Sequence, residues 1–214
     1  QAYEEAGATV MAKEIREKQA ELWINHNNCY SEAARNYEKA GDTVKAQEMW
    51  RKEAELRVTN NYYTGAAEAY EKAGDTVKAQ EMWRKQAEVW EADRDYYVEA
   101  ARNYEKAGDT VKAQKVWEEL ADLLEVNDYH YSAAARAYEK AGDIAKAKDT
   151  WIKAAKEFET DKNYTEAAEA YEKADDTAKA QEIWAKLAKE FEADKTYSAA
   201  ARAYEKAGDI AKAK

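Results

Sequence analysis

Residues 37–52 read YEKAGDTVKAQEMWRK, and the same sixteen letters return at residues 70–85. YEKAGD or a close relative starts seven times along the chain, at spacings of 33 or 34 residues. A fixed period of this length is typical of a repeat architecture. The starts are Tyr3, Tyr37, Tyr70, Tyr104, Tyr138, Tyr171 and Tyr204. The sequence thus predicts one repeat domain over residues 1–214, with units at about 1–27, 28–60, 61–94, 95–128, 129–161, 162–194 and 195–214, the first and last incomplete.

The composition favours helices joined by tight turns. The 214 residues include no proline and only seven glycines, whereas loops commonly use both. Sixteen Tyr and seven Trp supply more apolar surface than a disordered chain carries. The net charge is −10 without a basic block, which argues against nucleic acid or an anionic membrane as partner. No apolar run approaches the roughly 20 residues that a membrane span needs.

Each unit reads as two helices. Tyr30, Ala33, Ala34 and Tyr37 form an i, i+3, i+4, i+7 stripe that recurs from Tyr63, Tyr97, Tyr131, Tyr164 and Tyr197, and this spacing marks one face of a helix. The second helix carries its own stripe, which begins as Ala46, Trp50 and Ala54 and also recurs in later units. Two-helix hairpins of this size must stack on one another to bury their stripes.

The turn inside each unit is also predicted. Gly41, Gly74, Gly108, Gly142 and Gly208 follow the first helices, as left-handed C-terminal caps do. Asp42, Asp75, Asp109, Asp143 and Asp209 come next and can cap the second helices. Asp175 replaces the glycine of the sixth unit, so we expect a mildly strained turn there. Every glycine except Gly65 is assigned to a turn.

These residues resemble the tetratricopeptide repeat, whose 34-residue unit is a helix-turn-helix. Tyr63, Ala66, Ala67, Tyr70, Gly74, Ala79 and Trp83 follow its pattern in order. The Ala-Gly-Asp turn with a following Lys-Ala is similar to the SNAP-like subgroup. The resemblance implies an all-α fold, a right-handed α-solenoid of six to seven repeats. The proline usual near the end of the repeat is replaced by Val58, Glu91, Glu125, Glu159 and Glu192, which predicts longer second helices and an altered superhelical twist.

The sequence indicates no catalytic, metal or cofactor site. His26, in a polar joint, and His130, at the start of a first helix, lie about three repeats apart, which excludes a histidine dyad or metal pair. Cys29 is interpreted as a half-buried structural thiol. One glutamate stands before a lysine at the same place in six units, which is typical of scaffold: Glu38, Glu71, Glu105, Glu139, Glu172 and Glu205.

The resemblance implies that the first helices line a concave groove that binds a peptide or protein partner. The residues expected to face it are Ser31, Arg35, Thr64, Glu68, Val98, Arg102, Ser132, Arg136, Thr165, Glu169, Ser198 and Arg202. They lack the Lys and Asn with which some family members clamp an acidic C-terminus. The alternative is that the Arg and Glu residues form a ladder that only links repeats. Tyr62, Tyr96 and Tyr129 are further candidates for exposed contacts.

Three functions fit this sequence: a non-catalytic interaction scaffold, a structural protein that polymerises head to tail into a filament through uncapped ends, or a designed consensus array without biological role. The ends lack the polar capping helices of soluble solenoids, so the chain is expected to be an excerpt of a longer array or to dock on copies of itself. If a secretory signal preceded Gln1, Asn163-Tyr164-Thr165 is one glycosylation sequon, although the same residues also suit a helix start. The compartment stays open between cytoplasmic and extracellular.

Overall fold

The predicted helical hairpins form, and the all-α prediction is confirmed. The computed structural model describes residues 2–27, 29–127 and 130–213, with only the backbone described for residues 2–9, 26, 27 and 127. Within these ranges the regular structure consists of twelve α-helices and one short 3₁₀ helix, with no strand. No helix of the described ranges has an apolar stretch long enough to cross a membrane.

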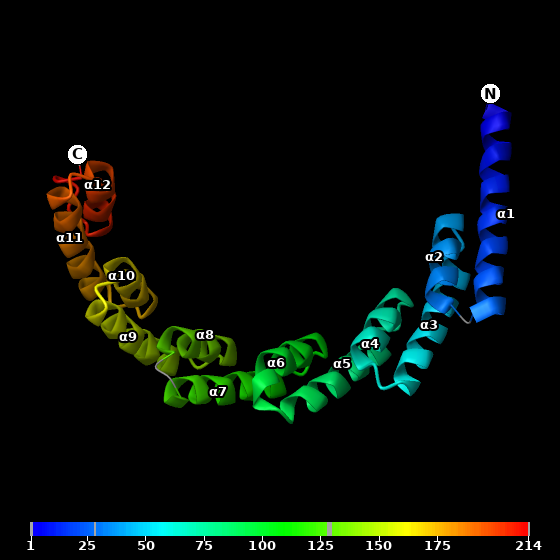
Figure 1. Cartoon of the computed structure of the whole chain (residues 1–214), viewed down its shortest axis with the longest axis horizontal. Helices are drawn as coiled ribbons and strands as arrows, with labels where there is room; N and C mark the ends of the chain where they lie inside the picture. Colours follow the sequence, from blue (N-terminus) through cyan, green and yellow to red (C-terminus); the bar gives the residue numbers. More distant parts are fainter. Residues whose placement is uncertain (1, 28, 128–129, 214) are drawn as a thin grey trace. The chain divides into compact units, whose positions relative to one another are not determined.

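The chain divides into two compact units, Gln1–Ala113 and Gln114–Lys214. In unit 1, α2, α4 and α6 lie along one side and α1, α3 and α5 along the other (Figure 1). Each helix packs mainly on its neighbours in the chain. The helices of unit 1 are α1 (Ala2–Asn27), α2 (Tyr30–Ala40), α3 (Thr43–Thr59), α4 (Tyr63–Lys72), α5 (Thr76–Glu91), η1 (Arg94–Tyr96) and α6 (Tyr97–Lys106).

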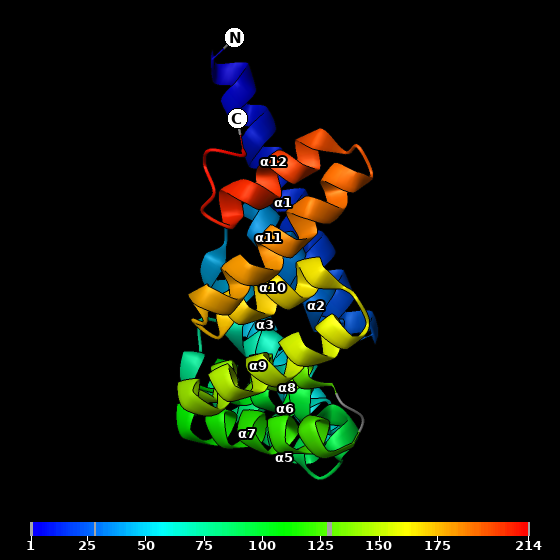
Figure 2. The same cartoon turned by 90° about the vertical axis from the view of Figure 1, so that its left-hand side faces the viewer.

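Unit 2 repeats this arrangement, and Figure 2 shows its helices following one another in chain order. The helix α7 begins just before the division between the units. The helices are α7 (Thr110–Asn127), α8 (Tyr131–Ala141), α9 (Ile144–Thr160), α10 (Tyr164–Lys173), α11 (Thr177–Ala193) and α12 (Tyr197–Lys206). The expectations of a single domain and of a right-handed twist stay predictions.

The buried residues are those of the two predicted stripes. The paired alanines of the first helices are almost all fully buried, as are the second tyrosine of each stripe and the Ala-Trp-Ala series of the second helices. One further buried position, immediately before the tryptophan, was not predicted, and it is occupied by Met49, Met82, Val116, Thr150 and Ile183. Small alanines let neighbouring helices approach closely, and the aromatic rings fill the remaining space.

The turn within each repeat is capped as predicted. Gly41 has a φ of +78°, and the backbone N–H of Asp42 donates to the carbonyl of Tyr37, the bond that defines a Schellman cap. The side chain of Asp42 then accepts from the backbone N–H of Lys45 at 3.0 Å. All five predicted glycines have positive φ, and all five predicted aspartates accept the same bond.

Gly41→Ala is expected to lower the free energy of unfolding by about 1–2 kcal/mol. A Cβ at Gly41 meets nothing within 4 Å, so the loss comes from the left-handed backbone alone. Gly41→Asn is the matched control, because asparagine tolerates this conformation better. Urea unfolding of the two variants measures the difference. Equal losses would show that the backbone conformation is not the cause.

Left-handed residues other than glycine occur at two kinds of turn. Asp175 has a φ of +61°, so the turn keeps the left-handed conformation where aspartate replaces glycine, and the mild strain expected there stays a prediction. Asn61, Lys162 and Lys195 have the same conformation. They lie in the joints between successive repeats, where the sequence predicted only polar character. The joint before α6 differs, because the spacing from Tyr70 to Tyr104 is 34 residues rather than 33 and the joint includes η1.

The amino-terminal region departs from the prediction. Gly7 lies inside α1, a continuous helix from Ala2 to Asn27, so its assignment to a turn was wrong. Ala8 stands where later repeats have the capping aspartate. Alanine cannot cap the start of a second helix, so no separate second helix is favoured here and α1 continues. The backbone of His26 also belongs to α1 rather than to a joint. The second helices are long, as predicted, with 16 residues in α5 and 17 in α3.

Candidate functional site

The surface of the first helices is the candidate functional site. None of the twelve predicted contact residues is buried, and the arginines and glutamates among them are all exposed. On each helix the two predicted residues are four positions apart, as Thr64 and Glu68 are on α4, so they lie one turn apart on the same face. Units 1 and 2 therefore present three first helices each. The serine, threonine or valine near the start of each of these helices is called the inner residue, and the arginine or glutamate one turn later is called the outer charge.

The outer charges make only local contacts. Arg35 pairs with Glu32 on its own helix at 3.8 Å, and Arg136 lies over the ring of Trp151, 6.0 Å from its centroid. Among the residues that the structure describes, no ion pair joins one of these arginines to Glu68 or Glu169. The alternative of an Arg/Glu ladder that links repeats is therefore absent from the described residues.

The hydroxyl of Ser31 is engaged locally. Its Oγ donates to Glu32 Oε2 at 2.6 Å. This hydrogen bond, helped by Arg35, lowers the pKa of the Glu32 carboxyl. The negative charge of Glu32 therefore lies beside the guanidinium of Arg35. It also lies in the first turn of α2, where it interacts favourably with the positive end of the helix dipole.

The repeated Glu-Lys pair has a structural role that the sequence did not predict in detail. The glutamate accepts a hydrogen bond from the indole Nε1 of the tryptophan twelve residues later, as Glu71 does from Trp83 at 2.7 Å. The same bond joins Trp50 to Glu38, Trp151 to Glu139 and Trp184 to Glu172. A carboxylate that satisfies a buried indole N–H belongs to the scaffold, which agrees with its repetition.

The lysine next to that glutamate covers the tryptophan of the preceding repeat. Lys106 Nζ lies 3.9 Å from the ring centroid of Trp83, within the range of a cation–π contact. Lys72 covers Trp50, Lys173 covers Trp151 and Lys206 covers Trp184 in the same way. The motifs at Tyr70 and Tyr171 make both contacts: the glutamate binds the tryptophan of its own hairpin, and the lysine covers the tryptophan of the previous hairpin.

The glutamates that replace the family's proline also join repeats. Tyr171 donates its hydroxyl proton to Glu159 at 2.6 Å. The equivalent bonds run from Tyr104 to Glu91, from Tyr138 to Glu125 and from Tyr204 to Glu192. Burial raises the pKa of the Tyr171 hydroxyl, and the hydrogen bond to Glu159 raises this pKa further. Val58 cannot accept such a bond, so the contact between α3 and α4 lacks it.

Tyr171→Phe is expected to lower the free energy of unfolding by about 1 kcal/mol at neutral pH. Because the folded-state pKa of Tyr171 lies above the unfolded value, the stability from its neutral hydroxyl is fully present below about pH 10 and is lost as the pH rises further. The difference between the wild type and Tyr171→Phe should therefore shrink above about pH 10. Denaturant unfolding at neutral and alkaline pH tests this, and a constant difference would contradict it.

The remaining candidate residues lie apart from one another. Tyr62 and Tyr96 are 55% and 48% exposed, which confirms them as surface residues, whereas Tyr129 lies outside the described residues. His130 is exposed at the start of α8, Cys29 is half-buried at the start of α2, and Asn163 is exposed before α10. In the described part of the chain, no three His, Cys, Asp or Glu residues are grouped to hold a metal ion.

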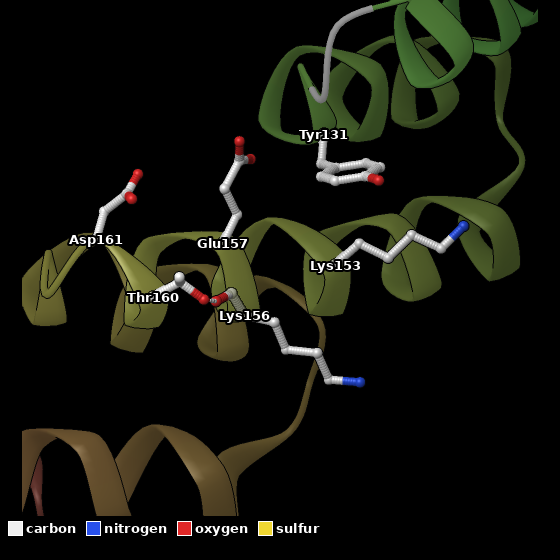
Figure 3. Close-up of a pocket in the computed structure, with 6 residues that line it drawn as sticks. All are labelled: Tyr131, Lys153, Lys156, Glu157, Thr160 and Asp161. Carbon is white, nitrogen blue, oxygen red and sulfur yellow. Dashed lines mark hydrogen bonds between the residues drawn. The ribbon is translucent and has the colours of Figure 1, made fainter.

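An open pocket of about 500 Å³ lies in unit 2, beside α8 and α9 (Figure 3). Tyr131 of α8 faces α9 there, whereas Glu157 and Lys156 extend in different directions. Lys153 pairs with Glu125, and Thr160 donates to the carbonyl of Lys156 at 2.9 Å. The six lining residues do not direct several polar groups at one point, so this pocket offers no arrangement for catalysis.

The stacked hairpins and their capped turns define the chain as a helical-repeat protein of the α-solenoid class. The family model described as Tetratricopeptide repeat matches residues 164–192, which are most of α10 and α11. This match supports the predicted resemblance of the repeats to the tetratricopeptide repeat.

Similarity to individual known proteins is low. No match was found among curated proteins. Among solved structures, the crystal structure of BtubC (BKLC) from P. vanneervenii is similar over 97% of this chain and 86% of that chain, with 18% sequence identity and a TM-score of 0.23.

Proposed function

We propose that the protein is a non-catalytic interaction scaffold that binds a peptide or protein partner on the first-helix faces of its two units. The observation that carries the proposal is the exposed outer charge row, which makes no ion pair between repeats in the ranges described. Exposed charges that do not link repeats are available to a partner, and they favour specificity and rapid association.

The inner row supports the same surface. Five of its six residues are Ser or Thr: Ser31, Thr64, Ser132, Thr165 and Ser198. Their side chains are short and each can accept a hydrogen bond, so a partner backbone can approach the helices closely. Tetratricopeptide repeats usually mediate protein interactions, and this family property agrees with the geometry.

A displayed peptide library, selected on the full chain, tests the proposal. We expect enriched peptides whose binding is weakened about tenfold or more by Ser132→Gln, Thr165→Gln and Ser198→Gln together, because three longer side chains obstruct the face. Ile144→Gln is the matched control, since Ile144 is exposed at the start of a second helix. A library that yields no peptide, or peptides unaffected by the triple variant, would overturn the proposal.

A second candidate function is self-assembly, favoured by two uncovered apolar side chains. Ile15 is 54% exposed, whereas Met49, at the same place in the next repeat, is 5% exposed. Tyr197 is 67% exposed, whereas Tyr164, its equivalent in the preceding repeat, is half-buried. In this proposal, α1 of a second copy packs beside α12 and covers both side chains.

Analytical ultracentrifugation over a range of protein concentrations tests self-assembly. Association should increase with concentration in the wild type and weaken in both Ile15→Glu and Tyr197→Glu. Val77→Glu, an exposed position on α5, is the control. A wild type that stays monomeric throughout would reject this second function.

A further inference from the structure

The outer charges follow the same order in both units. Unit 1 presents Arg35, Glu68 and Arg102 on α2, α4 and α6, and unit 2 presents Arg136, Glu169 and Arg202 on α8, α10 and α12. In each unit the order is positive, negative, positive. A bound segment that runs across three successive first helices meets the charges in this order.

The two units differ in the residue three positions before each outer charge. Unit 1 has Glu32 and Glu99 beside its arginines and Gly65 on the central helix. Glu32 offsets Arg35 through the ion pair between them, and Glu99 lies one turn before Arg102 on α6. Unit 1 therefore presents only a weak alternation of charge.

Unit 2 has the opposite distribution. Ala133 and Ala199 accompany its arginines, and Glu166 accompanies Glu169 on the central helix. The positive ends are not offset by a neighbouring carboxylate at this position, and the negative centre carries two carboxylates. Glu166, Glu169 and both arginines are exposed. The guanidinium of Arg136 is also placed over Trp151, a contact that limits its freedom before a ligand binds.

We propose that the face of unit 2 binds an extended peptide segment whose charges run acidic, basic, acidic, and that unit 1 binds the same segment more weakly. The proposal rests on the proposed function, because it names the partner of the same surface. Acidic residues of the peptide pair with Arg136 and Arg202, and its basic residue pairs with Glu166 and Glu169. The hydroxyls of Ser132, Thr165 and Ser198 lie one turn away and receive the peptide backbone.

The spacing of the charges in the peptide follows from helix packing. First helices of successive repeats are separated by the second helix that packs on both. Helices in contact have axes about 8–10 Å apart, and an extended chain rises about 3.3 Å per residue. The axes of two first helices that pack on the same second helix lie between one and two such distances apart, and a separation of about 10–17 Å corresponds to about three to five residues of extended chain.

Two sets of labelled synthetic peptides test this on the full chain by fluorescence anisotropy at low ionic strength, where exposed charges are least screened. One set has the order Glu, Lys, Glu and the other Lys, Glu, Lys, with neutral spacers that place the charges three, four or five residues apart. At the best spacing, we expect Glu-Lys-Glu peptides to bind about tenfold more tightly than Lys-Glu-Lys peptides. The former make three exposed ion pairs with the face of unit 2, whereas the latter place like charges opposite one another.

Matched charge reversals locate the site. Arg136→Glu, Glu169→Arg and Arg202→Glu together should invert the preference between the two peptide orders. The same three reversals in unit 1, at Arg35, Glu68 and Arg102, should change the affinity less than about twofold. Both triple variants change the net charge equally, and far-ultraviolet circular dichroism verifies that each remains helical.

Equal binding of the two peptide orders, or equal effects of the two triple variants, would overturn the proposal. If Ser132→Gln, Thr165→Gln and Ser198→Gln still abolish binding in that case, the interaction face stands and only the charge order is wrong. Failure of every peptide to bind also overturns the charge order, and the library selection then decides separately whether the face binds any peptide.

Discussion

Trp83→Ala is expected to lower the free energy of unfolding by about 3–5 kcal/mol, as the truncation of a large buried aromatic side chain does. Trp83 is 3% exposed. Its ring fills the space between α4, α5 and α6, its Nε1 donates to Glu71, and Lys106 of the next repeat covers its face. The substitution removes all three interactions and leaves a cavity where two hairpins meet.

Trp23→Ala is the matched control, because it removes the same side chain from a position that is 41% exposed. Its loss should be less than half that of Trp83→Ala, since less apolar surface returns to water. Calorimetry and denaturant unfolding measure both. Similar losses for the two variants would contradict the assignment of Trp83 to the core.

Hydrogen exchange gives a second measurement for Trp83→Ala. Each hairpin packs mainly on its neighbours, and the stability of such arrays is roughly a sum of local terms. Faster exchange is therefore expected in α4, α5 and α6, whereas exchange in α10, α11 and α12 should change little. A uniform change along the chain would show that the repeats unfold as one cooperative block.

Ala168→Leu is expected to have the second-largest effect, a loss of about 1–3 kcal/mol. Ala168 is fully buried on α10, and protein interiors are packed too closely to take a longer side chain without rearrangement. Accommodating leucine requires α10 to move away from its neighbours or the leucine to take an unfavourable rotamer.

Ala178→Leu is the control for this substitution. Ala178 is exposed on α11. The equivalent residues of other repeats are Val44, Val77 and Val111. Its change should lie within about 0.5 kcal/mol of zero. Thermal unfolding of both variants is the measurement, and a neutral Ala168→Leu would show that the alanine pair does not set the distance between helices.

Under the proposed function, binding and stability depend on different residues of this chain. The buried Tyr, Ala and Trp residues build the hairpins, whereas the outer charges and inner hydroxyls contribute little to packing. Variants of the binding face should therefore change ligand affinity without large changes in unfolding, and core variants should show the reverse. This separation allows the two sets of experiments to be interpreted independently.

The order of residues alone specifies the hairpins, their turns and most of their core. Gly41 and Asp42 lie within a few residues of the groups that they cap, and the stripe from Tyr30 to Tyr37 follows from the helical period. Such local features depend on backbone preferences and short-range hydrogen bonds, which can be read along the chain. The twelve candidate contact residues, which the resemblance to the tetratricopeptide repeat implies, are likewise exposed or half-buried.

The packing of the helices, in contrast, settles which side chains serve the repeats and which remain available. The bonds from Trp83 to Glu71 and from Tyr171 to Glu159 join residues twelve positions apart on different helices, and Lys106 reaches a tryptophan in another repeat. These pairings depend on distances of a few ångströms between packed helices, because hydrogen bonds and cation–π contacts weaken quickly with separation. In the described ranges, the packed helices also place Glu68 and Glu169 without an ion pair to the arginines of neighbouring first helices.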